Sequence, residues 1–295
     1  MLRRGGLVAI PTETVYGLGA DASNERAVRR IFAAKGRPVD HPLIVHLSSA
    51  TQLDDWAAHV SPAAAVLADA CWPGPLTLLV PRADHVLPVV TGGRDTVGIR
   101  VPAHPMTTEL LERFGGGLAA PSANRFGRVS PTTADHVALD LGDDVDLILD
   151  GGPCPIGVES TIVDCSVDPP QILRPGGIPT EEIAALLGAG LGSDLASASG
   201  PSRASGMLAS HYAPTARVLL ALDPQTVEAL LERHPDARVI GADVDAVTYA
   251  QRLYDWLRQA DTDGVDVVVA VLPAPAGLGH AIRDRLVKAA AHRAD

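Results

Sequence analysis

The sequence is poor in lysine, in cysteine and in the motifs that mark common enzyme classes. It has only two lysines and a formal net charge of −11, which argues against tight nonspecific binding of nucleic acid, because such binding depends on clustered basic side chains. Its three cysteines lack CxxC spacing, so neither a disulfide framework nor a zinc site is expected. A P-loop, a GxGxxG fingerprint, an HExxH motif and a nucleophile elbow are all absent. A nucleotide would therefore have to bind through a less common kind of binding site.

Long apolar runs are also missing. No window reaches 18 uninterrupted apolar residues, and the polar segment PTET follows the first apolar stretch too early for a signal peptide. We therefore expect a soluble, cytoplasmic protein with no membrane partner. At 295 residues with 46% hydrophobic content, the chain can bury substantial cores, and two domains are the better expectation.

An irregular series of strands and helices is predicted before residue 190. Apolar strands are expected at 7–10, 43–47, 76–80, 96–101, 117–120, 145–149, 160–165 and 171–176. Helices are expected between Asn24 and Gly36 and near 62–71, 105–114, 132–141 and 180–187. Because the later strands follow one another without intervening helices, the pattern favours an α+β or mixed-sheet domain over residues 1–189.

The composition changes after this domain. Residues 188–206 are rich in Gly, Ser and Ala without apolar periodicity, so a flexible linker is expected over 190–215, ending in the segment SHYAP. Residues 216–295 then show three strand–helix alternations, with helices at 224–234, 247–260 and 279–291. This alternation predicts a small Rossmann-like domain with a parallel sheet.

Cationic and hydroxyl side chains recur in Gly/Pro-rich loops of the first domain. Arg100 lies within an apolar strand, and a buried guanidinium needs an anionic partner, which a carboxylate or phosphate would supply through two parallel bonds. Lys35 and Arg37 flank a glycine at a helix C-terminus, a pattern more often typical of a solvated turn. The segment 120–133, APSANRFGRVSPTT, joins small polar side chains, two arginines and a helix start, although an ordinary helix cap would look similar. Together these weak signals predict a small polyanionic ligand beside a carboxylate.

Taken in order, eight motifs closely resemble those of the threonylcarbamoyl-AMP synthases. They are PTETVYGLG, KGRPVDHPLIVHL, WPGPLTLLV, VGIRVPAHP, PSANRFGRVSPT, GVESTIVD, ILRPGGI and SHYAP. The resemblance covers about residues 5 to 215, and the remaining tail is similar to the C-terminal domain of the family's larger form, which follows a YrdC-like catalytic domain. It implies a twisted, mostly antiparallel mixed sheet with a positively charged cavity. It also implies an enzyme that makes threonylcarbamoyl-AMP and pyrophosphate from L-threonine, bicarbonate and ATP, towards threonylcarbamoyladenosine in tRNA.

The resemblance also implies two sets of site residues. The threonine side should comprise Thr14, His46, Arg100, Ser122 and Ser160. The ATP side should comprise Lys35, Arg37, His41, Thr96, Asn124, Ser130 or Thr132, Arg174 and Tyr212. Mg²⁺ is expected with the triphosphate, held by phosphate oxygens and water rather than by a carboxylate cage, and Tyr212 is expected to act in a lid. A threonylcarbamoyl transferase complex and tRNA are the expected downstream partners.

Two alternatives stay open at this point. An RNA-binding or ribosome-maturation factor would use the same cavity without catalysis, although it would not need the full threonine set. A carbamoyl transferase of related fold would act on another acceptor, as in hydrogenase-maturation proteins. Those proteins carry zinc-finger and acylphosphatase-like regions, which this sequence does not contain.

Overall fold

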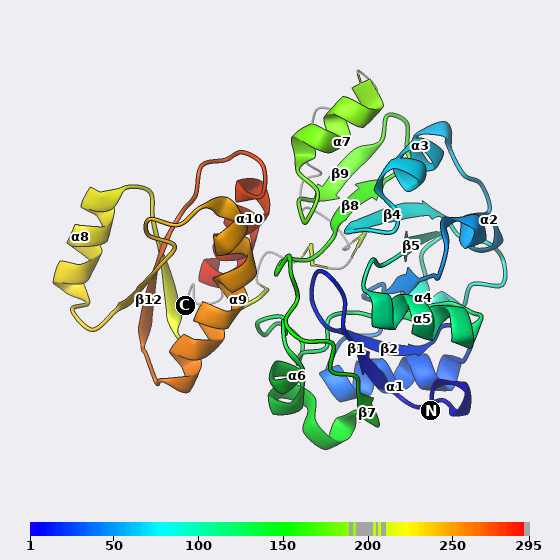
Figure 1. Cartoon of the computed structure of the whole chain (residues 1–295), viewed down its shortest axis with the longest axis horizontal. Coiled ribbons are helices and arrows are strands. Elements are labelled where there is room, and N and C mark those ends of the chain that lie inside the picture. The colour runs from blue at the N-terminus through cyan, green and yellow to red at the C-terminus, as the bar shows by residue number, and fades with distance from the viewer. Residues whose placement is uncertain (189–190, 193–202, 205, 208–210, 292–295) are drawn as a thin grey trace.

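Two sheets organise the chain, one large and mixed, the other small and parallel (Figure 1). The structure is a computed structural model that describes residues 1–188, 191–192, 203–204, 206–207 and 211–291. Of the expected linker at 190–215, the residues 190, 193–202, 205 and 208–210 lie outside the described part. Within the described part, no helix combines the length and the apolar character needed to cross a bilayer.

The large sheet holds nine strands in the order β7-β1-β2-β6-β3-β5-β4-β8-β9. Their bounds are β1 (Val8–Ile10), β2 (Gly17–Asp21), β3 (Ile44–His46), β4 (Leu76–Pro81), β5 (Thr96–Arg100), β6 (Leu118–Ala119), β7 (Leu147–Ile148), β8 (Thr161–Asp164) and β9 (Gln171–Arg174). The pairs β1–β7, β3–β5 and β4–β8 are parallel, and the other five pairs are antiparallel. The mostly antiparallel mixed sheet predicted from the sequence is therefore confirmed.

Strand β2 was not predicted from the sequence, and neither were the short helices α2 (Leu53–Trp56) and α4 (Pro88–Thr91). The β2 residues GLGAD resemble a glycine-rich turn, because glycine is unfavourable in a strand. The two glycines are needed for close packing: a Cβ at Gly17 would lie 3.3 Å from the Cβ of Ala120, and one at Gly19 would lie 3.2 Å from the carbonyl oxygen of Val8. The tight approach of neighbouring strands therefore overrides the local propensity.

Helices cover the large sheet. They are α1 (Glu25–Lys35), α2 (Leu53–Trp56), α3 (Pro62–Cys71), α4 (Pro88–Thr91), α5 (Pro105–Phe114), α6 (Ala134–Leu141) and α7 (Thr180–Leu187), with 3₁₀ turns at Leu2–Arg4, Ala50–Gln52 and Gly142–Asp144. Helix α1 begins and ends as its sequence predicts. The Asn24 side chain accepts a hydrogen bond from the backbone N–H of Ala27, and Gly36 closes the helix with a φ of 64°. This end of α1 delivers Lys35 and Arg37 to the centre of the molecule.

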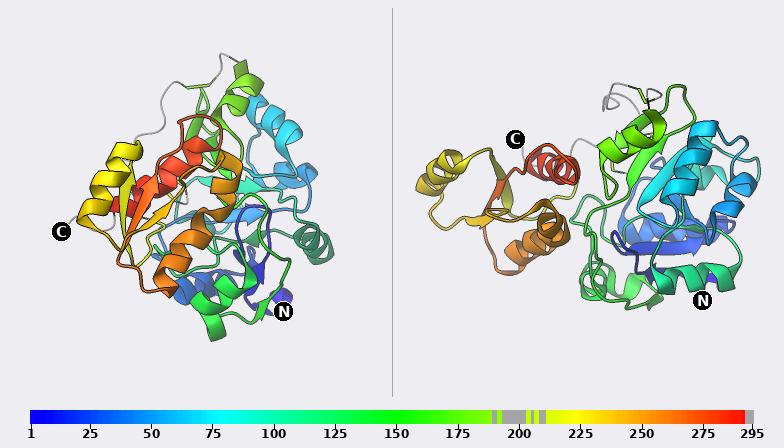
Figure 2. Two further views of the ribbon diagram at one scale, coloured as in Figure 1. Left: turned by 60° about the vertical axis from the view of Figure 1, so that its left-hand side comes forward. Right: turned by 45° about the horizontal axis from the view of Figure 1, so that its top comes forward.

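The second body contains three parallel strands, β10 (Arg217–Ala221), β11 (Arg238–Ile240) and β12 (Val267–Val271), in the order β10-β12-β11. Its helices are α8 (Pro224–Arg233), α9 (Ala246–Thr262) and α10 (Gly279–Ala290). The predicted alternation of strands and helices is confirmed. Figures 1 and 2 show α9 and α10 on the side of this sheet that faces the large body, with α8 on the far side.

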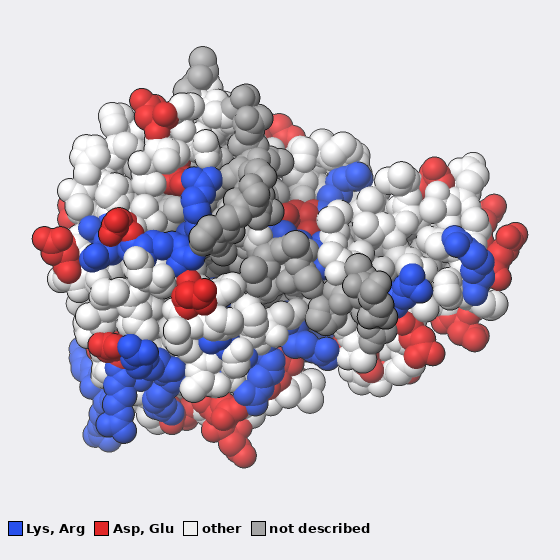
Figure 3. Space-filling model, turned by 180° about the vertical axis from the view of Figure 1, so that it is seen from behind, with Lys and Arg blue, Asp and Glu red and all other residues white. Residues whose placement is uncertain are grey.

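The two bodies share a continuous apolar core. Val15, Val129 and Val158 of the first body belong to the same buried cluster as Leu253 and Tyr254 of α9. Figure 3 shows the exterior from behind, where acidic and basic side chains are interspersed over both lobes and some basic ones gather at the lower left. Polar contacts also join the two bodies, among them the 2.7 Å ion pair between Arg258 of α9 and Asp140 of α6.

Candidate functional site

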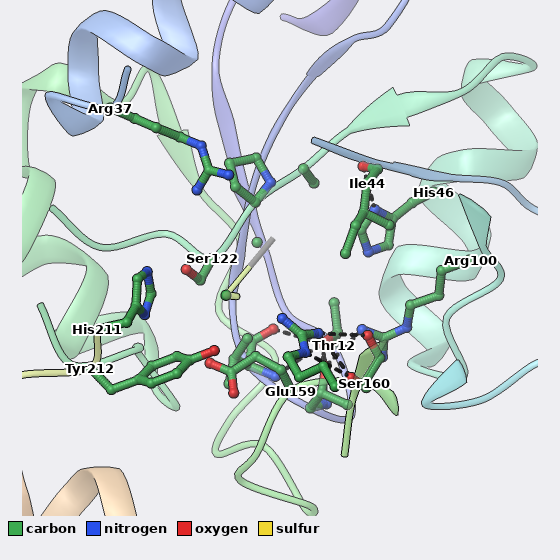
Figure 4. Close-up of a pocket in the computed structure, with 17 residues that line it drawn as sticks. Thr12, Arg37, Ile44, His46, Arg100, Ser122, Glu159, Ser160, His211 and Tyr212 are labelled. Carbon is green, nitrogen blue, oxygen red and sulfur yellow. Dashed lines mark hydrogen bonds between the residues drawn. The ribbon is translucent and has the colours of Figure 1, made fainter. Parts of the chain in front are cut away.

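A pocket opens where loops and strand ends of the large sheet meet the segment before β10 (Figure 4). The space between its protein atoms measures about 550 Å³, a figure that includes open solvent. The described lining comes from the segment after β1, the loop after α1, strand β3, the end of β5, the segment after β6, the start of β8, the end of β9 and residues 206, 211 and 212. Residues far apart in the sequence thus meet at one place.

Eight of the fourteen predicted site residues line this pocket. They are the complete threonine set, Thr14, His46, Arg100, Ser122 and Ser160, and three members of the ATP set, Arg37, Arg174 and Tyr212. Figure 4 shows His46 and Arg100 on one side, with Arg37, His211 and Tyr212 on the other. Ser122, a member of the threonine set, lies in this view near Arg37 and His211, so the two predicted sets meet in one hollow without a strict division between its walls.

Arg100 occupies the end of β5 and is 4% exposed. Its Nη1 atom donates a 2.8 Å hydrogen bond to Oγ1 of Thr14, and its Nη2 atom lies 2.8 Å from Oε1 of Glu13. The anionic partner that a buried guanidinium requires is thus Glu13, which belongs to the segment PTET and was not among the predicted site residues. A buried ion pair at the pocket wall can still offer its guanidinium to a bound carboxylate.

His46, beside Arg100 on β3, has a pKa lowered to about 3, first by burial and then by the positive charge of Arg100. Its imidazole is therefore neutral at pH 7 and adds no second charge to this wall. Ser160 lies within 2.8 Å of the Thr77 hydroxyl, and it also receives a 3.2 Å hydrogen bond from Arg174. This wall consequently presents hydroxyls, one neutral ring and one guanidinium.

On the opposite wall, Arg37 is buried and donates a 3.0 Å hydrogen bond to the carbonyl of Pro42. Burial lowers its pKa to about 10, so the side chain stays cationic at neutral pH. Arg174 ends β9 and donates from Nη2 to the carbonyl of Ser160 at 2.8 Å. Tyr212, at a left-handed φ of 63°, stands with its ring beside that of His211, with centroids 4.2 Å apart. Arg37 and the aromatic pair thus form this side, whereas Arg174 stands beside Ser160.

Three predicted residues lie behind the lining and hold it in place. Lys35 is buried. Its Nζ donates a 2.6 Å hydrogen bond to the carbonyl of Ser122 and another hydrogen bond to the carbonyl of Asn124. The Asn124 amide in turn donates to the carbonyls of Arg125 and Arg128, both at 2.8 Å. Ser130 donates a 2.6 Å hydrogen bond to Oε1 of Glu159. Each of these polar groups has a protein partner.

The remaining three predicted residues lie outside the described lining. His41 packs edge-on against Phe126, with ring centroids 5.3 Å apart. Thr96 begins β5, four residues and therefore about 13 Å along the strand from Arg100. The Thr132 hydroxyl lies 3.4 Å from Nδ1 of His136. The ATP roles of these three residues stay predictions.

Two titratable residues of the lining, Glu159 and His211, were not among the predicted site residues. Glu159 precedes Ser160 in GVES, and His211 precedes Tyr212 in SHYAP, so both lay inside quoted motifs. Burial lowers the pKa of His211 to about 3, which makes it neutral at pH 7. The pKa of Glu159 is lowered to about 2, because the positive charges of Arg285 and Arg174 outweigh burial, which acts in the opposite direction.

The site offers no carboxylate cage for a metal ion in the described part of the chain. No group of three or more His, Cys, Asp or Glu side chains there is arranged to hold one. Glu159 is the carboxylate in the described lining, and its two oxygens already accept hydrogen bonds from Ser130, Tyr254 and Arg285. The expected binding of Mg²⁺ through phosphate oxygens and water stays a prediction.

Each of the two bodies matches a known protein family. Residues 1–176 match the family described as "Telomere recombination", which comprises the Sua5, YciO and YrdC proteins, and residues 178–291 match the family described as "Threonylcarbamoyl-AMP synthase, C-terminal domain". The threonylcarbamoyl-AMP synthases of Pyrococcus abyssi and Bacillus subtilis are 44% and 42% identical to this chain, over 99% of it and 92% of each relative.

A solved structure extends the likeness to the fold. The crystal structure of P. abyssi Sua5 complexed with L-threonine matches with a TM-score of 0.94 and 42% identity, over 99% of this chain and 92% of that one. The likeness therefore includes the large sheet, the small sheet and their arrangement. Because two family matches, near full-length relatives and a solved structure agree, the chain belongs to the two-domain, Sua5-type family of threonylcarbamoyl-AMP synthases.

Proposed function

We propose that the pocket holds L-threonine and ATP side by side, with the threonine carboxylate at Arg100 and the phosphates at Arg37 and Arg174. The observation that carries this proposal is the presence of three buried guanidinium groups in one hollow: Arg100 beside His46, Arg174 beside Ser160, and Arg37 on the other side. Buried guanidinium groups favour anionic ligands, since a carboxylate or phosphate matches their paired donors. Thr14, His46, Ser122 and Ser160 would complete the threonine side.

The proposed chemistry needs no nucleophile from the protein. The threonine amine condenses with bicarbonate to give an N-carboxylate and water. An oxygen of this carboxylate then attacks the α-phosphorus of ATP, and the bond to pyrophosphate breaks. The residues of the pocket therefore act by holding the two anions at reacting distance and by offsetting their charge, which can lower a barrier substantially in a site shielded from water.

The other predicted ATP residues would act mainly through the lining. Lys35 and Asn124 fix the segment that carries Ser122, and Ser130 fixes Glu159. Mg²⁺ would be bound through phosphate oxygens and water and would neutralise part of the triphosphate charge. Tyr212, with His211, would close the nucleotide side and keep water from the labile mixed anhydride.

The product defines the partners that we propose for this protein. A carbamoyl group activated as an adenylate is a donor to an amine, so the next step is transfer to a nucleoside of tRNA by a threonylcarbamoyl transferase complex. ATP, bicarbonate and tRNA belong together in the cytoplasm, where we propose that the protein acts. The acidic net charge agrees with a protein that releases its product rather than one with a large RNA footprint.

One assay tests the proposed substrates. The purified chain is incubated with ATP, bicarbonate and labelled L-threonine, and pyrophosphate and labelled adenylate are measured. We expect both to form in equal amounts and only when threonine is present. Pyrophosphate release that is independent of threonine would contradict the proposal. Binding of RNA without any adenylate would favour a factor that uses the pocket without catalysis.

A further inference from the structure

A buried carboxylate at the pocket wall is held mainly by the second body. Oε1 of Glu159 accepts a 2.6 Å hydrogen bond from Ser130 of the large body. Oε2 accepts one from Oη of Tyr254 in α9 and one from Nε of Arg285 in α10, both at 2.8 Å. Two of these three donors therefore reach the pocket lining from the other body, across the apolar interface.

Arg285 connects two strand ends that carry pocket residues. Its side chain is completely buried, and besides binding Glu159 it donates from Nη1 to the carbonyl of Pro175 at 2.8 Å. Glu159 immediately precedes Ser160, and Pro175 immediately follows Arg174. Both neighbours line the pocket, where Arg174 donates to the Ser160 carbonyl. One guanidinium from α10 thus fixes the spacing between the start of β8 and the end of β9.

The side chains of Arg285 and Tyr254 also contact the ring of Tyr212, which lines the pocket. The Cζ atom of Arg285 lies 5.2 Å from the centroid of the Tyr212 ring, within cation–π distance. The Tyr254 ring stacks on the Tyr212 ring, with centroids 5.8 Å apart and an angle of 26° between the planes. The orientation of Tyr212 therefore depends on residues of the second body as well as on its own left-handed backbone.

Stability alone does not account for this arrangement. A buried ion pair is costly to desolvate, and well-packed apolar side chains often stabilise such a position equally well. The guanidinium of Arg285 contacts Glu159, the Pro175 carbonyl and the Tyr212 ring at once, besides its 2.7 Å pair with the adjacent Asp284, and an apolar side chain could not make this combination of contacts.

We propose that Arg285 and Tyr254 are positioning residues of the synthase reaction, which set the nucleotide side of the pocket by fixing Glu159, the end of β9 and the Tyr212 ring. The C-terminal body is then part of the active enzyme rather than an attached module. This inference rests on the ATP role proposed for Arg174 and Tyr212. The threonine side should be affected less, because the Ser160 hydroxyl keeps its 2.8 Å contact with Thr77.

The test uses the full chain with Arg285→Met, Arg285→Lys and Tyr254→Phe. Tyr254→Phe is the sharpest variant, since it removes one hydrogen bond to Glu159 and keeps the ring. We expect Tyr254→Phe to raise the KM for ATP at least about 5-fold and Arg285→Met at least about 10-fold, with the KM for threonine changed less than about 3-fold. Arg285→Lys keeps the charge without the planar fork and should fall between wild type and Arg285→Met.

The control variant is Gln251→Ala. Gln251 also lies on α9 and also bonds across the interface, to the carbonyl of Pro155 at 2.9 Å, but it does not touch Glu159. It should leave both KM values within about 2-fold of wild type. An unchanged ATP KM in Tyr254→Phe would overturn the inference even if Arg285→Met failed to fold, and so would an equal rise in Gln251→Ala. A wild-type chain without threonine-dependent pyrophosphate release would instead contradict the proposed function.

Discussion

Glu13 and Arg100 form a buried ion pair, with Oε1 and Nη2 2.8 Å apart and both side chains less than 10% exposed. The pair stands at the wall where we place the threonine carboxylate. Glu13 therefore serves as the counterion of Arg100 when no substrate is bound, because an uncompensated guanidinium in this position would be strongly destabilising.

Glu13→Gln should lower the free energy of unfolding by about 3 kcal/mol, since it leaves the Arg100 charge buried without its partner. The threonine carboxylate can replace the missing charge, so saturating L-threonine should raise the melting temperature more in Glu13→Gln than in wild type. Thermal unfolding with and without threonine measures both effects. Glu109→Gln, in an exposed pair with Arg113, is the control and should cost less than about 1 kcal/mol. A smaller threonine-induced shift in Glu13→Gln would contradict this account.

Lys35 distinguishes a supporting role from direct contact with phosphate. Its Nζ is bonded to backbone carbonyls of Ser122 and Asn124, so Lys35→Met should leave buried acceptors without a donor and cost about 2 kcal/mol of stability in urea unfolding. ATP affinity should fall only as far as the Ser122 segment shifts. If stability were unchanged while ATP affinity fell more than 100-fold, Lys35 would instead be a direct phosphate ligand.

Acid should destabilise the protein in a window set by His46 and His211. Both have a folded-state pKa lowered to about 3, below the ordinary value of 6.5, so the unfolded chain binds more protons between these limits. Stability should therefore fall as the pH falls from about 6.5 towards 3, by up to about 1.4 kcal/mol per pH unit for each histidine.

Urea unfolding between pH 7 and pH 4 measures this loss. The double variant His46→Gln, His211→Gln should show a shallower decline over the same range. Glu159 acts in a lower window: its pKa is lowered to about 2, so its contribution is present above about pH 4.5 and is lost as the pH falls towards 2. An equally steep decline between pH 6.5 and 5 in the double variant would show that other groups cause the acid sensitivity.

Gly157 tests how closely the two bodies must approach. Its φ is 82°, and a Cβ there would overlap the backbone of Ala250 and Gln251 in α9. Gly157→Ala should therefore cost at least about 2 kcal/mol, because backbone strain and a backbone clash act together. Gly115→Ala, with a φ of 75° and open space around the new Cβ, carries the strain alone and should cost about 1 kcal/mol. Equal losses in the two variants would mean that α9 moves away freely.

Local patterns predicted most strands and the longer helices, and the resemblance of the ordered motifs implied eight residues of the pocket lining. Helix α1 between Asn24 and Gly36 is an example in which capping chemistry alone sets both ends. Strand β2 was missed because its glycines serve contacts with strands distant in the sequence.

The partners of the site residues were not predictable in the same way. Glu13, Tyr254 and Arg285 act through contacts formed only in the fold, and Glu159 and Arg285 are 126 residues apart. For the same reason the sequence did not show that Lys35 hydrogen-bonds to Ser122 and Ser130 to Glu159, since these partners are distant in the sequence.

The most direct test of the two-sided pocket compares Arg100→Ala with Arg37→Ala in the pyrophosphate assay, with KM measured for each substrate. Arg100→Ala should raise the KM for threonine on the order of 100-fold, with the KM for ATP within about 3-fold of wild type, and Arg37→Ala should show the reverse. Arg113→Ala, on the exterior, should change neither. If each pocket variant raised both KM values equally, or if neither value changed, the assignment of threonine to Arg100 and of ATP to Arg37 would be contradicted.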